Sequence, residues 1–274
     1  MSNPYEAFLP LSHRTGIQPE HTWWEWASER VHIARKRRKA PVRVIVVHGL
    51  GTHSGALWPL VAAIPGADLA AIDLPKTPLY DDWLRLLEAF ISSEHDDRPL
   101  ILIGAGTGGL LCAEAAHRTG LVTHVIATCL LNPSDQPTRR ALFRFSPLTR
   151  LIQGPLRNRE LPMTRVLNFN KISRSPALGK LCAADEHSGG SKITWGFLAS
   201  FFQHKAKFGT TPVTLMHPEH DSLTPVELSL RTLARIKGPT EVVMLKDCGH
   251  FPIEEPGFTT MVETVTKIIK RNSL

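Results

Sequence analysis

Residues 100–116 read LILIGAGTGGLLCAEAA, and the glycine-rich centre of this segment constrains the fold more than any other part of the chain. Residues 100–103 form a short apolar run of the kind that makes a buried parallel strand. From Leu110 the apolar spacing is that of a helix. The four glycines between them permit a sharp turn and a close approach of helix to strand. A strand, a tight turn and a helix in this order indicate an α/β protein.

Strand and helix patterns alternate on both sides of this unit. The strand VRVIVV at 42–47 ends in the tight turn HGLG. Alternation at this spacing predicts a mostly parallel twisted sheet with helices on both faces and right-handed crossovers. Further strands are predicted at 68–72, 123–131, 212–216 and 241–245, helices at 57–64, 82–92, 225–237 and 258–271, and an edge strand or hairpin at 21–33.

The alternation stops between Pro133 and about Lys207, where proline, arginine and short amphipathic segments dominate. The most apolar helical piece there is ITWGFLASFFQ at 193–203. We therefore predict one α/β core built from residues 1–133 and 209–274, with a helical cap or lid inserted at 134–208. No internal repeat or long linker separates two domains.

The composition fits a soluble globular protein with a sizeable core, since 42% of the residues are apolar and 21% are charged. The N-terminus lacks the pattern of a signal peptide, and no apolar run approaches the roughly 18 residues of a membrane span. The four cysteines are scattered, without CxxC or metal-ligand spacing. We expect a cytoplasmic protein with reduced thiols, no metal and no stable membrane insertion.

The net charge of +7 is unevenly distributed. The run RKRRK at 35–39 is expected to be a solvated turn between two strands. Residues 136–180 hold ten Lys or Arg residues and one acid, Glu160. Two interpretations of this excess are open, scattered surface charge and a rim that attracts an anionic small-molecule substrate. No nucleic-acid partner is expected, because the basic residues are not interleaved with aromatic ones. The sequence does not indicate an oligomeric state.

The glycine-rich turn also fits a dinucleotide-binding fingerprint, Gly104-x-Gly106-x-x-Gly109. That fingerprint requires an acidic residue about 20 residues further on, to bind the ribose. The segment 123–131 has no acid, and the first one after it is Asp135. FAD or NAD binding is therefore the weaker alternative, and no cofactor is predicted.

Four motifs in this order resemble the α/β-hydrolase family, in its single-domain form with a helical cap. They are VRVIVVHGLG at 42–51, AIDLP at 71–75, LILIGAGTGG at 100–109, and Asp221 followed by His250. The resemblance covers nearly the whole chain from about residue 21. The frame Gly104-x-Gly106-x-Gly108 matches the G-x-S-x-G nucleophile elbow of that family, with Gly106 at the position of the serine. The order of nucleophile, acid and histidine is that of the family.

The resemblance implies a role for each matching position. His250 is the general base, and Asp221 fixes its tautomer and orientation. The backbone N–H groups of Leu50 and Thr107 form the oxyanion hole, and the Thr107 side chain is expected to point away from the site of attack. The substrate is expected to contact His48, Gly49, Leu223 and Phe251.

Two other groups of residues could act in the site. Asp135 is a possible alternative acid, although a helix cap or turn is the more ordinary role. His217, His220 and Asp221 have the spacing of metal ligands, but a single turn is a poor place for three ligands to converge. The sequence therefore favours Asp221 as the acid and predicts no metal.

The predicted activity is hydrolysis of an ester, thioester or lactone by a Ser-Asp-His type mechanism. The attacking serine hydroxyl of that mechanism is missing here, because position 106 is glycine. Three explanations of the glycine fit the sequence. It is an engineered inactivation, a natural loss that leaves a small-molecule binding protein, or the mark of a non-hydrolytic reaction in which His250 is the sole acid and base.

Overall fold

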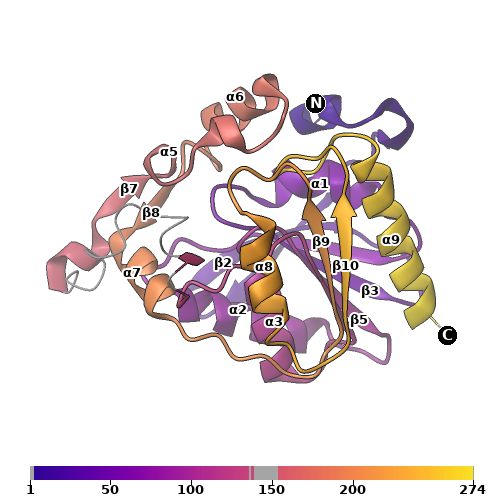
Figure 1. Ribbon diagram of the computed structural model, residues 1–274. Coiled ribbons are helices and arrows are strands. Elements are labelled where there is room, and N and C mark those ends of the chain that lie inside the picture. The colour runs from indigo at the N-terminus through magenta and orange to yellow at the C-terminus, as the bar shows by residue number, and fades with distance from the viewer. Residues whose placement is uncertain (1–2, 136, 139–153, 274) are drawn as a thin grey trace.

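The computed structural model describes residues 3–135, 137–138 and 154–273 (Figure 1). An eight-stranded sheet runs through it in the order β1-β2-β4-β3-β5-β6-β9-β10. Strand β2 pairs antiparallel with β1 and β4, and all other neighbours are parallel, as the sequence predicts. The strands are β1 (Glu20–Trp26), β2 (Glu29–Lys36), β3 (Arg43–Val47), β4 (Asp68–Ile72), β5 (Leu100–Gly104), β6 (His124–Ala127), β9 (Val213–Pro218) and β10 (Thr240–Leu245).

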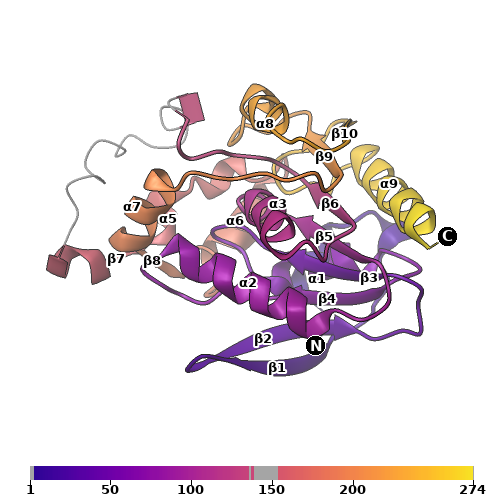
Figure 2. The same cartoon turned by 90° about the horizontal axis from the view of Figure 1, so that it is seen from below.

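Helices cover both faces of this sheet, which confirms the predicted fold class (Figures 1 and 2). Helices α1 and α9 pack on one face, and α2 and α3 pack together on the other. Among the described residues, no helix is both long and apolar enough to cross a bilayer. The helices of the sheet domain are α1 (Ser54–Ala62), α2 (Tyr80–Glu94), α3 (Gly108–Thr119), α8 (Val226–Leu233) and α9 (Gly257–Asn272).

Helix α1 begins at Ser54, before the predicted start at residue 57. The cause is a contact distant in sequence. The Asp73 carboxylate, which follows β4, accepts hydrogen bonds from the Ser54 backbone N–H at 2.6 Å and from its hydroxyl at 2.9 Å. An acceptor at the first turn satisfies a backbone donor that no helical carbonyl can reach. A local pattern cannot show such a cap.

Two predictions about local structure are wrong. The apolar run at 123–131 forms a strand only over β6, and the rest is a buried loop in which the Leu130 N–H donates to the Ser229 hydroxyl. The basic run at 35–39 is not wholly a solvated turn. Its first two residues belong to β2, where Arg35 donates to both carboxylate oxygens of Glu94. An apolar run in the sequence does not show at which residue strand pairing ends. A run of charged residues does not show which of them form ion pairs with residues distant in the sequence.

The described part of the segment between β6 and β9 gathers on one side of the sheet domain (Figure 1). It includes a short antiparallel pair of strands that the sequence did not predict. Arg139, Arg140 and Arg144, part of the basic excess, lie outside the described residues. The elements are η4 (Gly154–Asn158), β7 (Glu160–Pro162), α5 (Met163–Val166), η5 (Phe169–Lys171), α6 (Pro176–Ala184), β8 (Lys192–Thr194) and α7 (Trp195–Gln203).

Candidate active site

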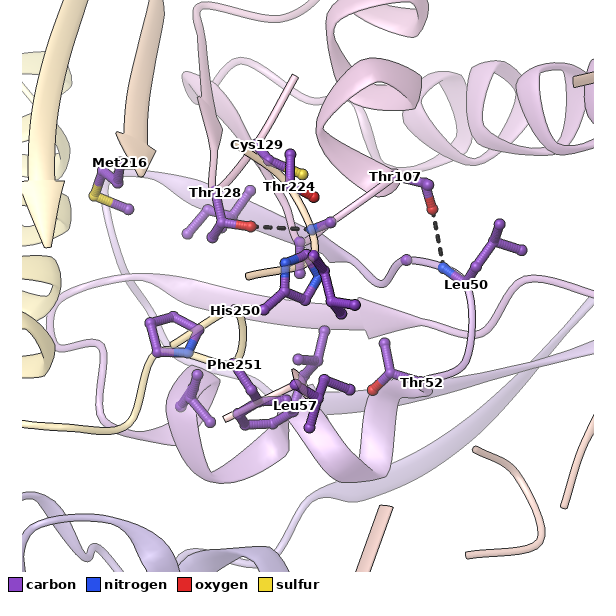
Figure 3. Close-up of a pocket in the computed structure, with 18 of the residues that line it drawn as sticks. Leu50, Thr52, Leu57, Thr107, Thr128, Cys129, Met216, Thr224, His250 and Phe251 are labelled. Atoms are coloured by element: carbon purple, nitrogen blue, oxygen red, sulfur yellow. Dashed lines mark hydrogen bonds between the residues drawn. The ribbon is translucent and has the colours of Figure 1, made fainter. Parts of the chain in front are cut away.

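The glycine-rich turn joins β5 to α3 at the carboxyl edge of the sheet. Gly106 has a φ of 56°, in the left-handed region that an elbow at this position requires. Its N–H donates to the Thr128 hydroxyl at 3.0 Å, which fixes the turn to the loop after β6 (Figure 3). A Cβ atom built on Gly106 would make only ordinary van der Waals contacts. The turn therefore has the conformation and the space for a side chain at position 106.

His250 and Asp221 form a hydrogen-bonded pair beside this turn. His250 Nδ1 lies 2.8 Å from Asp221 Oδ2, and His250 Nε2 lies 3.4 Å from the position that a Cβ atom would take on Gly106. Asp221 follows β9, and His250 follows β10, the parallel neighbour of β9. Adjacent parallel strands thus place the Asp221 carboxylate and the His250 imidazole at one edge of the sheet.

The environment of Asp221 keeps it ionised. Burial raises the pKa of this carboxyl group, but the charge and hydrogen bond of His250 and the Thr224 N–H more than offset that effect, so its pKa is lowered. The Leu223 N–H also donates to Oδ1, at 2.9 Å. An ionised acceptor favours the His250 tautomer with a proton on Nδ1. Nε2 is then the unprotonated nitrogen, and it faces Gly106.

Thr107 departs from the expected geometry. Its side chain does not point away from the site, because Thr107 Oγ1 accepts a hydrogen bond from the Leu50 N–H at 2.9 Å (Figure 3). Leu50 was expected to give that donor to the oxyanion. Both residues line the pocket at Gly106. The N–H that the family resemblance assigned to an oxyanion hole is therefore engaged by a hydroxyl of the same chain, which residue types alone do not reveal.

His48 supports the loop that carries Leu50. Its Nδ1 lies 2.8 Å from the Gly49 carbonyl oxygen, and its Nε2 accepts the Leu74 N–H at 2.9 Å. Burial lowers the pKa of His48, although Asp73 acts in the opposite direction. A neutral imidazole that bridges two loops has a structural task. His48 does not line the pocket at Gly106, where the sequence placed it, but a smaller cavity of about 120 Å³.

Asp73 is a supporting residue to which sequence reasoning gave no role. Burial raises its pKa, but hydrogen bonds from His32 and from the Ser54 N–H and hydroxyl prevail and bring it to about 2. A carboxyl group whose pKa falls on folding stabilises the protein above its unfolded pKa, and this contribution is lost as the pH falls through the folded pKa.

We expect Asp73→Asn to remove this pH-dependent stabilisation. The lowered pKa corresponds to about 1 to 2 kcal/mol at neutral pH, allowing for partial exposure of the carboxylate. Urea unfolding of both proteins at pH 7, 4 and 2.5 measures it. The gap between their free energies of unfolding should be widest at pH 7 and shrink toward pH 2.5. A gap independent of pH would contradict the assignment.

A pocket of about 280 Å³ opens at Gly106 and His250. Its lining includes Gly49, Leu223 and Phe251, three of the four residues predicted to contact substrate. Sequence reasoning missed Thr52, whose buried hydroxyl has no hydrogen-bond partner among the described residues. Figure 3 shows this residue and His250 on the pocket wall. A lone threonine in a loop carries no signal that would identify it from the sequence.

The remaining candidates lie elsewhere. Asp135 pairs with Arg235 at 2.8 Å rather than with His250. His217 is buried, with Nδ1 on the Pro218 carbonyl oxygen, so it does not converge with His220 and Asp221 on an ion. The group of possible ligands found among the described residues is instead Glu219, His220 and Asp247, all exposed.

Comparison with known proteins agrees with the resemblance found in the sequence motifs. The sequence model of a family described as the alpha/beta hydrolase family matches residues 44–260. A search of curated proteins finds no significant match. Solved structures that are similar in fold include a monoacylglycerol lipase of Paleococcus ferrophilus and a soluble variant of the monoglyceride lipase of Saccharomyces cerevisiae in complex with a substrate analogue.

These similarities extend over nearly the full length of each chain. The Paleococcus enzyme has a TM-score of 0.71 and 21% identity, over 86% of this chain and 98% of that one. The yeast enzyme has a TM-score of 0.75 and 15% identity, over 97% and 99%. An esterase from Rhodococcus sp. ECU1013 has a TM-score of 0.66 and 18% identity, over 93% and 100%. At such identities the solved structures establish the shared fold.

Proposed function

Because the chain belongs to the alpha/beta hydrolase family, we propose that its pocket binds a carboxylic ester, thioester or lactone, with the carbonyl group beside Gly106. One observation carries the proposal. His250 Nε2 faces the position of a side chain on Gly106, while its Nδ1 is bonded to the buried Asp221 carboxylate. This is the arrangement of a general base and its orienting acid.

The proposed chemistry requires a group that attacks the carbonyl carbon. A serine hydroxyl at position 106 would pass its proton to Nε2 as it attacks, and Asp221 would stabilise the imidazolium ion that forms. Glycine has no such group. Loss of the serine alone lowers kcat by about 10⁶-fold in subtilisin, so we expect this chain to bind its substrate and turn it over slowly. The direct test is ester hydrolysis by a Gly106→Ser variant.

Residues 134–208 are proposed to act as the cap over this pocket. Leu167, Lys171 and Ile172, which lie in that range, line it together with Gly106 and His250. Lys171 is an exposed cation at the lining, which favours a substrate with an anionic group on the cap side.

A second candidate function is ligand binding without turnover. It is favoured by Gly106 together with the hydrogen bond from the Leu50 N–H to Thr107 Oγ1, because both features weaken catalysis and leave the pocket intact. The two candidates differ in the response to a restored nucleophile. A serine hydrolase site gains turnover, whereas a site specialised for binding does not.

Removing the Thr107 hydroxyl should release the Leu50 N–H to the oxyanion. In the Gly106→Ser background, we expect Thr107→Val to raise kcat for 4-nitrophenyl acetate by about 10-fold, less than the 10²–10³-fold that a full oxyanion-hole donor contributes. Valine keeps the branched shape at this position. Thr107→Ser, which keeps the hydroxyl, is the control and should show no increase. A loss of kcat in the valine variant would mean that the hydroxyl positions the loop.

A further inference from the structure

The pocket at Gly106 continues into an apolar chamber between helices α1 and α9. Its floor is the sheet face on which Val46 of β3 and its pairing partner Ile103 of β5 lie. Its walls come from the two helices that cover this face. We define the α1–α9 chamber by six residues, Val46, Leu60, Val61, Ile103, Met261 and Val265.

Every residue of the α1–α9 chamber is apolar, and each is at most 8% exposed. The part of the pocket nearer the cap differs, since Asn168, Lys171 and Ser222 line it. His250 and Gly106 line the same pocket, and Figure 3 shows Leu57 and Phe251 among the other residues that line it. The pocket therefore has a buried apolar part and a polar part, and His250 is one of its lining residues.

Such a chamber has a defined chemical preference. It offers no polar side chain, so a ligand's hydroxyl or amide group would lose its hydrogen bonds to water without replacement. Each buried methylene, by contrast, gains about 0.8 kcal/mol on transfer from water, equivalent to about fourfold in affinity. The whole pocket of about 280 Å³ lies at the small end for ligand sites, which excludes ligands with two long chains.

We propose that the α1–α9 chamber binds the single unbranched acyl chain of the substrate, with the ester carbonyl beside Gly106 and the alcohol or thiol part toward the cap. This inference rests on the proposed function for the position of the carbonyl group. It adds a substrate class, esters of straight-chain carboxylic acids, and it identifies the chain-length determinants as residues of α1 and α9.

The test is binding of straight-chain carboxylates, from butanoate to dodecanoate, to the unaltered chain by titration calorimetry. We expect the dissociation constant to fall about fourfold per added methylene until the chamber is full, and then to level off or rise. A terminal hydroxyl on the tightest-binding chain should weaken binding more than tenfold. Equal dissociation constants across the series, or tolerance of the terminal hydroxyl, would overturn the proposal.

Variants of chamber residues test where the acyl chain binds. The break in the series is the carboxylate length at which the dissociation constant stops falling. Val265→Phe should move the break in the series to shorter carboxylates, and Leu60→Ala should move it to longer ones. Val61→Leu adds one methylene and replaces the phenylalanine variant if that protein does not fold. Glu263→Phe adds the same ring to the exposed side of α9 and should leave the series unchanged. If the break occurs at the same carboxylate length in every folded variant, the acyl chain binds outside the α1–α9 chamber.

This binding experiment is separate from the test of the hydrolase proposal. It uses the chain with Gly106 in place and requires no turnover. If carboxylates bind with the expected series but the Gly106→Ser variant is inactive, the chamber stands and the hydrolase proposal fails. If that variant hydrolyses esters at the same rate for every acyl length, and all carboxylates bind with the same dissociation constant, the chamber proposal fails and the hydrolase proposal stands.

Discussion

Replacing Gly106 with serine should raise the hydrolysis of 4-nitrophenyl esters by several orders of magnitude. The pocket and the hydrogen-bonded pair of His250 and Asp221 are already in place, and a Cβ atom at this position meets no close neighbour. Loss of the nucleophile alone costs about 10⁶-fold in a serine protease, which sets the upper limit of the gain. The engaged Leu50 N–H reduces it by about 10²–10³-fold, the contribution of one full oxyanion-hole donor, so we expect about 10³–10⁴-fold in kcat.

The matched control is Gly106→Ala. Alanine and serine both place a side chain where φ is 56°, a strain of about 1 to 2 kcal/mol that glycine avoids. The two variants should therefore unfold at the same temperature, below that of the unaltered chain, while only the serine variant hydrolyses ester. His250→Gln in the serine background should remove the gain. A folded serine variant with background activity would refute the hydrolase proposal.

Replacing Gly109 with alanine should destabilise the protein by about 3 kcal/mol, the upper range for forcing an atom into a packed interior. A Cβ atom at this position would overlap the backbone carbonyl oxygen of Cys129 and lie 2.9 Å from the Ala127 side chain. Helix α3 can therefore approach the loop after β6 only because residue 109 has no side chain. Helix propensity acts in the opposite direction, since alanine is preferred to glycine by up to about 1 kcal/mol.

Gly120→Ala separates steric overlap from backbone strain. Gly120 ends α3 with a φ of 66°, and nothing lies within 4 Å of an added Cβ atom. That variant should lose only about 1 kcal/mol. Urea unfolding of the two variants and the unaltered chain gives the comparison. A Gly109→Ala protein as stable as the parent would mean that α3 shifts freely away from the sheet.

The sheet was largely predictable from the sequence because each buried strand is a short apolar run bounded by turn residues, as in 42–47 and 100–103. The pairing of Asp221 with His250 was implied by the family resemblance, whereas the adjacency of β9 and β10, which brings their following loops to one edge of the sheet, is seen only in the structure. The end of β6 was not predictable. An apolar run continues unchanged from a strand into a buried loop, and only the partners of Leu130 and Thr128 show where pairing stops.

The parts of the site that the sequence did not reveal depend on side-chain direction or distant partners. Thr107 was assigned through its backbone N–H, and nothing in its residue type shows that its hydroxyl binds Leu50. Asp73 lay in a recognised motif, but its partners His32 and Ser54 come from different elements. The cap side, including β7 and β8, could not be assigned because short segments rich in proline and arginine lack clear periodicity.

The strand order has a consequence for how the site forms during folding. Leu50, Gly106, Asp221 and His250 follow β3, β5, β9 and β10, so the pocket draws on strand ends from both halves of the chain. Contacts between segments so far apart in sequence form slowly, because the chain between them must first be ordered. The site is complete only when β10 has joined the sheet. Ligand binding during refolding would therefore report the addition of β10 to the sheet, and partly folded chains that lack this strand pairing would remain unable to bind.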